Sequence, residues 1–202
     1  MPPYRVLTLD DVEAVPGPAS LAWRPQRAEL GLRAFGVSSF VAANAGEDVI
    51  EAHTETDGRG HQELYVVMRG SARFTLDGES FDAPAGTLIS VPDPQVRRHG
   101  VATQPGTEVL AFGGDAVFRP AGHEWMWRVR HLLPDQVERA RALADAGLAE
   151  LPDSPGIWYV QALVAAAERH PEAARKWLAK AAEREPGLLD EARAEPLLAD
   201  VA

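Results

Sequence analysis

The chain has 202 residues, of which 46% are hydrophobic and 25% are charged; this is the composition of a globular protein and excludes a disordered chain. It has no cysteine, which excludes disulfides, thiolate zinc sites, cysteine-held iron–sulfur clusters and a cysteine nucleophile. Thirty acidic against twenty basic residues give a net charge of −10, which disfavours nucleic acid and anionic membrane surfaces as partners. At about 150 residues per domain, the length predicts one domain and a smaller appendage.

The sequence shows no sign of export or of membrane insertion. Its first residues contain no basic segment leading into an apolar run, so we expect no signal peptide. No stretch approaches the roughly 18 to 20 apolar residues that are needed to span a bilayer. Together these features predict a cytoplasmic protein without a membrane partner.

The first two thirds of the chain show the short, evenly spaced strands of an antiparallel β domain. Apolar or alternating runs, each stopped by glycine or proline, predict strands over residues 64–68, 72–76, 87–91 and 108–112. Asp77-Gly78 follows the second run, and this dipeptide is favoured in two-residue hairpin turns because both positions need positive φ. The spacing predicts an antiparallel sandwich or barrel.

The hydrophobic period becomes helical from Pro134 onward. Apolar residues at three- and four-residue steps predict a helix over residues 134–150. Pro155 and Pro171 predict the first turns of two further helices, because proline is tolerated where a helix begins. Residues 188–198 have room for a short capping helix.

These patterns predict two domains. We place the boundary between Trp127 and Pro134, with a β-barrel over residues 1–129 and a helical segment over residues 134–202. Trp125 and Trp127 alternate along the chain before this boundary and are expected to share one face of a strand. Large aromatic side chains near a domain junction bury much area, so we expect them to pack the β part against the first helix.

The β part contains a pattern of histidine and glutamate residues that indicates a functional site. Glu63 and Gly70 are separated by six residues, and His53-Thr54-Glu55 lies upstream of them. This arrangement resembles the first motif of the cupin superfamily, which runs from His-x-His to Glu-x6-Gly. Glu55 replaces the second histidine of that motif, and the link between its two parts is longer than usual.

A second pattern strengthens the resemblance. Gly86 and Pro92 match the opening of the second cupin motif, Arg97 stands at the position of its histidine, and His99 lies two residues further on. The resemblance covers roughly residues 35–115 and implies an antiparallel cupin or jelly-roll barrel. It also implies a metal site of three histidines and one carboxylate, with open positions for water or substrate.

The candidate ligand pocket follows from these positions and consists of His53, Glu55, His61, Glu63, Arg97 and His99. Residues two apart on a strand face the same way, so His53 and Glu55 share one face. His53, Glu55 and Glu63 are the candidate metal ligands; their oxygen-rich set suits manganese or iron, with zinc as a further candidate. In the alternative no metal binds, and Arg97 pairs with Glu63 or Glu55.

The helical part has a resemblance of its own. Residues 155–188 look like one tetratricopeptide repeat of 34 residues, with Trp158, Ala162 and Pro186 at expected positions. The helix over residues 134–150 looks like the second half of an earlier repeat. One and a half repeats bury little core, so we expect this segment to pack on the barrel, on another subunit or on a protein partner. An ordinary helical hairpin is the alternative.

Three functions are compatible with the sequence. The first is a barrel that binds or senses a small molecule, with helices that mediate association. The second is a metal-dependent cupin enzyme, such as a dioxygenase or an isomerase, and the third is an interaction protein with a filled barrel. Arg97 favours the first over the second because a guanidinium cannot ligate a cation. The resemblance to cupins also implies a homodimer.

Overall fold

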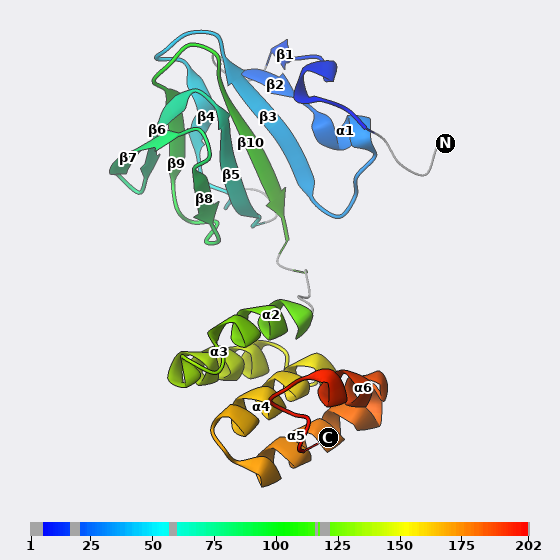
Figure 1. The fold of residues 1–202 in the computed structure, drawn as a ribbon. Coiled ribbons are helices and arrows are strands. Elements are labelled where there is room, and N and C mark those ends of the chain that lie inside the picture. The colour runs from blue at the N-terminus through cyan, green and yellow to red at the C-terminus, as the bar shows by residue number, and fades with distance from the viewer. Residues whose placement is uncertain (1–5, 17–20, 57–59, 116, 118–121, 202) are drawn as a thin grey trace. The chain divides into compact units, whose positions relative to one another are not determined.

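The structure is a computed structural model that describes residues 6–16, 21–56, 60–115, 117 and 122–201. Its internal contacts divide the chain into two compact units, Met1–Phe118 and Arg119–Ala202, which we name the β unit and the helical unit (Figure 1). Residues 1–5, on which the expectation about a signal peptide rests, lie outside the described residues. None of the described helices is long and apolar enough to cross a membrane.

The β unit contains two antiparallel sheets within the described residues (Figure 1). One has the strand order β1 (Val15–Pro16), β2 (Ala22–Arg24), β3 (Gly36–Ala42), β10 (Thr107–Gly114), β5 (Gln62–Arg69) and β8 (Leu88–Val91). The other has the order β4 (Asp48–His53), β9 (Arg98–Ala102), β6 (Ser71–Leu76) and β7 (Glu79–Pro84). Two short helices, η1 (Leu9–Asp11) and α1 (Gln26–Leu30), precede β3. The antiparallel β architecture predicted from the sequence is confirmed.

An apolar core joins the two sheets. Side chains alternate along each strand, so every second residue of a strand points toward the opposite sheet. Val67 on β5 and Val109 on β10 meet Phe74 on β6 in one cluster, and all three are fully buried. The ring of Tyr65 on β5 lies 5.8 Å from that of Phe74, centroid to centroid. This packing determines which face of each strand points toward the opposite sheet.

The predicted hairpin turn at Asp77-Gly78 is confirmed. Its two residues have positive φ angles of 47° and 90°, and Leu76 pairs with Glu79 across the turn. The backbone N–H of Arg97 donates a 2.7 Å hydrogen bond to the Asp77 carboxylate, and the Asp77 N–H donates to the Arg97 carbonyl at 2.9 Å. The turn therefore holds the chain immediately before β9 and helps to set the register of that strand.

The helical unit is built around one buried helix. Its described helices are α2 (Gly122–Leu132), α3 (Val137–Glu150), α4 (Pro155–Ala167), α5 (Pro171–Arg184) and α6 (Gly187–Ala194). α4 packs against α2, α3 and α5, and its residues Ile157–Ala165 are all buried, as expected of a helix that is apolar on every side. The predicted helix starts at Pro155 and Pro171 are correct, and the helix expected from residue 134 begins at Val137. The repeat character and the partners of this unit stay predictions.

The boundary expected between Trp127 and Pro134 is wrong in position. Residues 122–129, assigned to the barrel from the sequence, lie in α2 and belong to the helical unit. Trp125 and Val129, four residues apart, are buried on one face of this helix, whereas Trp127 is 63% exposed. The alternation in the sequence is part of a helical pattern, because a segment this short fits both periods.

Two glycines allow a test of the packing in the β unit. Gly70 and Gly86 both have positive φ, at 68° and 90°. A Cβ at position 70 would lie 2.9 Å from Cα of Thr107, whereas a Cβ at position 86 would meet nothing within 4 Å. We expect Gly70→Ala to lower the free energy of unfolding of the β unit by about 3 kcal/mol and Gly86→Ala by about 1 kcal/mol. Denaturation followed by circular dichroism measures both, and equal losses would contradict the prediction.

Candidate functional site

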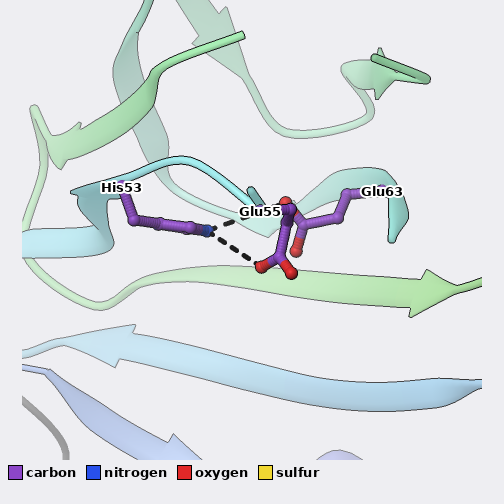
Figure 2. Close-up of side chains that lie close together, drawn as sticks. All are labelled: His53, Glu55 and Glu63. Carbon is purple, nitrogen blue, oxygen red and sulfur yellow. Dashed lines mark ion pairs between the residues drawn. The ribbon is translucent and has the colours of Figure 1, made fainter. Parts of the chain in front are cut away.

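Three of the predicted site residues meet where the two sheets face each other (Figure 2). His53 ends β4, Glu55 follows two residues later, and Glu63 lies near the start of β5. Nε2 of His53 is 3.5 Å from Oε1 of Glu55 and 3.7 Å from Oε2 of Glu63. The side chains are partly buried, with exposed fractions of 27%, 21% and 12% in that order. All three side chains therefore keep some contact with solvent.

The His53 ring is oriented by the backbone of its own strand. Nδ1 lies 2.8 Å from the carbonyl oxygen of Glu51, so Nδ1 carries a proton and donates it there. Nε2 then faces the carboxylates of Glu55 and Glu63, and protonation of Nε2 turns this contact into a charged hydrogen bond. The interaction with Glu63 raises the pKa of His53 above its usual value, although burial acts in the opposite direction.

Glu63 is the most heavily contacted of the three. The Tyr65 hydroxyl donates a hydrogen bond to its Oε2, and Nε of Arg98 lies 3.2 Å from the same oxygen. Burial raises the pKa of Glu63, but hydrogen bonds from His53 and Tyr65 and the charge of Arg98 outweigh it, so that pKa lies below its usual range. Burial also raises the pKa of Tyr65. At neutral pH Glu63 is a carboxylate and Tyr65 is a neutral donor.

Arg98, not Arg97, lies beside Glu63, which corrects the prediction from the sequence. Arg98 pairs with His53 between β9 and β4 and has no exposed surface, whereas the side chain of Arg97 is exposed. Gly100 lies on the same inward face of β9 as Arg98, and a Cβ there would lie 3.2 Å from a core aromatic ring. Counting along the motif misplaces the inward residue by one position, because strand periodicity does not set the length of the loop before β9.

The guanidinium of Arg98 is incompletely hydrogen-bonded. Nη1 donates to the carbonyl oxygen of Pro94 at 3.3 Å, and Nε contacts Glu63 as an ion pair without good hydrogen-bond geometry. Nη2 is buried and has no hydrogen-bond partner in the described part of the chain. Arg98 is thus a buried cation balanced by one nearby carboxylate.

The two remaining predicted histidines take different places. His61 lies just before β5, with Nδ1 3.9 Å from Oε2 of Glu55 and Nε2 3.6 Å from Oδ1 of Asp115, so it adjoins the cluster. His99 lies on the outward face of β9, where its Nε2 is 2.8 Å from Oδ1 of Asp48. The expectation that His99 reaches the pocket is therefore wrong. Neighbouring residues of a strand point to opposite faces, and Arg98, the residue before His99, points inward.

Tyr65, Arg98 and Asp115 are not among the site residues predicted from the sequence. Tyr65 lies two residues after Glu63 on the same strand, so alternation places both side chains on one face. Arg98 lies two residues before Gly100, where the backbone approaches the core closely, so Arg98 also faces inward. No local pattern marks Asp115. It follows β10, and the pairing of β10 with β5 brings it toward the site.

A divalent cation is the group that the resemblance to cupins implies for this site. One donor atom each of His53, Glu55 and Glu63 lies within 4.8 Å of the others, and such donors suit manganese, iron or zinc. However, Nε of Arg98 lies 3.2 Å from a carboxylate oxygen of this set. Its permanent positive charge repels an incoming divalent ion, whereas the two carboxylates attract one. The guanidinium therefore makes this donor set a poor fit for a resident metal ion.

Comparison with solved structures finds similarity to cupin proteins. A cupin protein from Bacteroides fragilis is 19% identical, with a TM-score of 0.43, over 58% of this chain and 88% of that one. A cupin-superfamily sugar phosphate isomerase from Silicibacter pomeroyi is 15% identical, with a TM-score of 0.45, over 55% and 76%. A cupin 2 conserved barrel domain protein from Salinispora arenicola is 22% identical, with a TM-score of 0.42, over 55% and 87%.

These similar structures are cupin proteins, and the likeness covers little more than half of the chain. No family profile and no curated protein matches the sequence. The likeness concerns the fold and does not extend to a ligand, a reaction or the helices.

The buried ion pair can be tested with two neighbouring arginines. Arg98→Met leaves the carboxylate of Glu63 without its cation, and we expect it to lower the free energy of unfolding of the β unit by about 3 kcal/mol. Arg97→Met is the matched control and should change it by no more than about 0.5 kcal/mol, because that side chain is exposed. Denaturant titration measures both, and similar losses would show that Glu63 does not depend on Arg98.

The charge on His53 gives a pH-dependent prediction. Its raised pKa means that the charged form stabilises the fold fully below the ordinary value of about 6.5, and this stabilisation is lost as the pH rises through the folded value. Glu63→Gln should lower the pKa of His53, whereas Asp82→Asn, which breaks an ion pair with Arg73, should not. NMR titration of the ring measures the pKa. A value unchanged by Glu63→Gln would rule out this coupling.

Proposed function

We propose that the β unit is a cupin-type barrel that binds a small organic molecule at His53, Glu55 and Glu63. The observation that carries the proposal is the convergence of charged, partly exposed side chains from both sheets at one place. Desolvating such groups costs free energy, and a barrel filled only for stability gains nothing from them. The match of Glu63 and Gly70 to the first cupin motif supports the family assignment.

The side chains that are exposed at the site restrict the chemical class of the ligand. His53, Glu55, His61 and Glu63 keep exposed surface, whereas Arg98 is sealed. The ligand therefore meets two carboxylates and two imidazoles, which form an acceptor-rich surface without an accessible permanent cation. Hydroxyl groups and ammonium groups satisfy such acceptors, and phosphates or carboxylates are repelled by them. We infer that the ligand is a polyol, a sugar or a small amine.

A metal-dependent cupin enzyme is the second candidate. It is favoured by the three donor atoms that lie within 4.8 Å of one another, and it is disfavoured by the guanidinium beside them. Elemental analysis of the full chain, purified without chelator, separates the two candidates. About one equivalent of manganese, iron or zinc that disappears in His53→Ala would support the enzyme, and its absence would support the binding protein.

The ligand class can be tested by NMR on the full chain with panels of monosaccharides, polyols, amines, hydroxycarboxylates and sugar phosphates. We expect saturable shifts of the His53 ring signals with members of the first three panels and none with the anions. Gly113→Leu places a side chain against Glu63 and His61, since a Cβ at Gly113 would lie 3.8 Å from both, and should weaken binding at least about tenfold.

The matched control for this experiment is His99→Ala, which removes a histidine from the outward face of β9 and should leave the binding unchanged. Tighter binding of the anionic panels would contradict the ligand class. No binding from any panel to the folded chain would contradict the proposed function.

A further inference from the structure

We propose that Arg98 is a permanent cation bound to one carboxylate of this site, Glu63, and that its guanidinium prevents His53, Glu55 and Glu63 from binding a divalent cation. The proposal deepens the proposed function by making the binding site metal-independent. It assigns Arg98 a positioning role, because its sealed side chain acts through Glu63 and does not reach a ligand.

The backbone places position 98 where a ligand of the cluster would stand. Arg98 and His53 are paired residues on the neighbouring strands β9 and β4, and both side chains point toward the six-stranded sheet. From there the guanidinium reaches Glu63 on β5 at 3.2 Å. The side chain at position 98 therefore reaches from β9 to the same carboxylate oxygen of Glu63 that faces His53.

The charge at position 98 is permanent. A guanidinium stays protonated at every pH at which the protein is folded, so it cannot yield to an incoming metal ion as an imidazole does by losing its proton. It also provides no lone pair for coordination. Its Nε lies 3.2 Å from Oε2 of Glu63, so positive charge lies against the carboxylate that a metal ion would need.

An imidazole at position 98 would have neither the permanent charge of the guanidinium nor its lack of a lone pair for coordination. Arg98→His removes the permanent charge and adds a second nitrogen donor to the set of one histidine and two carboxylates. Two imidazoles and two carboxylates make a complete four-donor site for zinc or cobalt. The single substitution should therefore turn a site that excludes divalent cations into one that binds them.

The experiment compares the full-length wild type, Arg98→His and Arg97→His by calorimetric titration with Zn²⁺ alone and by the visible absorption of added Co²⁺. We expect Arg98→His to bind one Zn²⁺ per chain at least about 100-fold more tightly than the other two, with a tetrahedral Co²⁺ spectrum. Arg97→His adds the same imidazole to an exposed neighbouring position and controls for surface binding. Adding Glu63→Gln to Arg98→His should abolish the gain.

Two results would overturn the proposal. One is a wild type that binds one Zn²⁺ as tightly as Arg98→His and loses it in His53→Ala. The other is an Arg98→His chain that is folded, by circular dichroism and amide hydrogen exchange, and binds Zn²⁺ no more tightly than Arg97→His.

A further measurement needs no variant and decides the question if Arg98→His does not fold. NMR signals of the His53 ring in the wild type should not respond to equimolar Zn²⁺, and a saturable response would overturn the proposal. The outcome is independent of the ligand panels. A gain of Zn²⁺ binding in Arg98→His supports the proposal for Arg98 even if no organic compound binds. Conversely, binding of a polyol or an amine does not decide whether Arg98 excludes a metal ion.

Discussion

A guanidinium with no exposed surface lies 3.2 Å from a nearly buried carboxylate, and the arrangement of the site depends on this ion pair of Arg98 and Glu63. The two residues belong to different sheets, so their interaction is made only when the sheets pack face to face. Each charge would be costly without the other. The pair also determines what else the site holds, because the oxygen of Glu63 that meets Arg98 is the one that faces His53 and Tyr65.

The loop before β9 ties this ion pair to the rest of the site. The carbonyl oxygen of Pro94 accepts hydrogen bonds from Nη1 of Arg98 at 3.3 Å and from the backbone N–H of Glu55 at 2.9 Å. One backbone atom thus positions both the buried cation and the more exposed carboxylate. The same loop is held at its other end by the Asp77 turn through Arg97. A hairpin turn on β6 and β7 therefore contributes to the geometry of a site to which it supplies no side chain.

Each unit of the chain has a core of its own. The β unit is filled by a cluster that includes Val67 and Phe74, and the helical unit by clusters on both sides of α4. All the described residues of the candidate site come from the β unit. The chemistry proposed for the site therefore needs no side chain from the helices.

The sequence by itself determined the features that depend on a few neighbouring residues. Three features are of this kind: the strands with alternating side chains, the positive φ values at Asp77-Gly78, and the prolines that begin α4 and α5. Each depends only on nearby residues, because backbone sterics and side-chain alternation act over two to four positions. His53 and Glu63 were found through the resemblance of residues 53–70 to the first cupin motif. Only the tertiary structure decided that Arg98 faces inward, since its register depends on contacts with Asp77, about 20 positions away, and with the opposite sheet. Alternation allows either of two neighbouring arginines to enter the core, and long-range packing selects one of them.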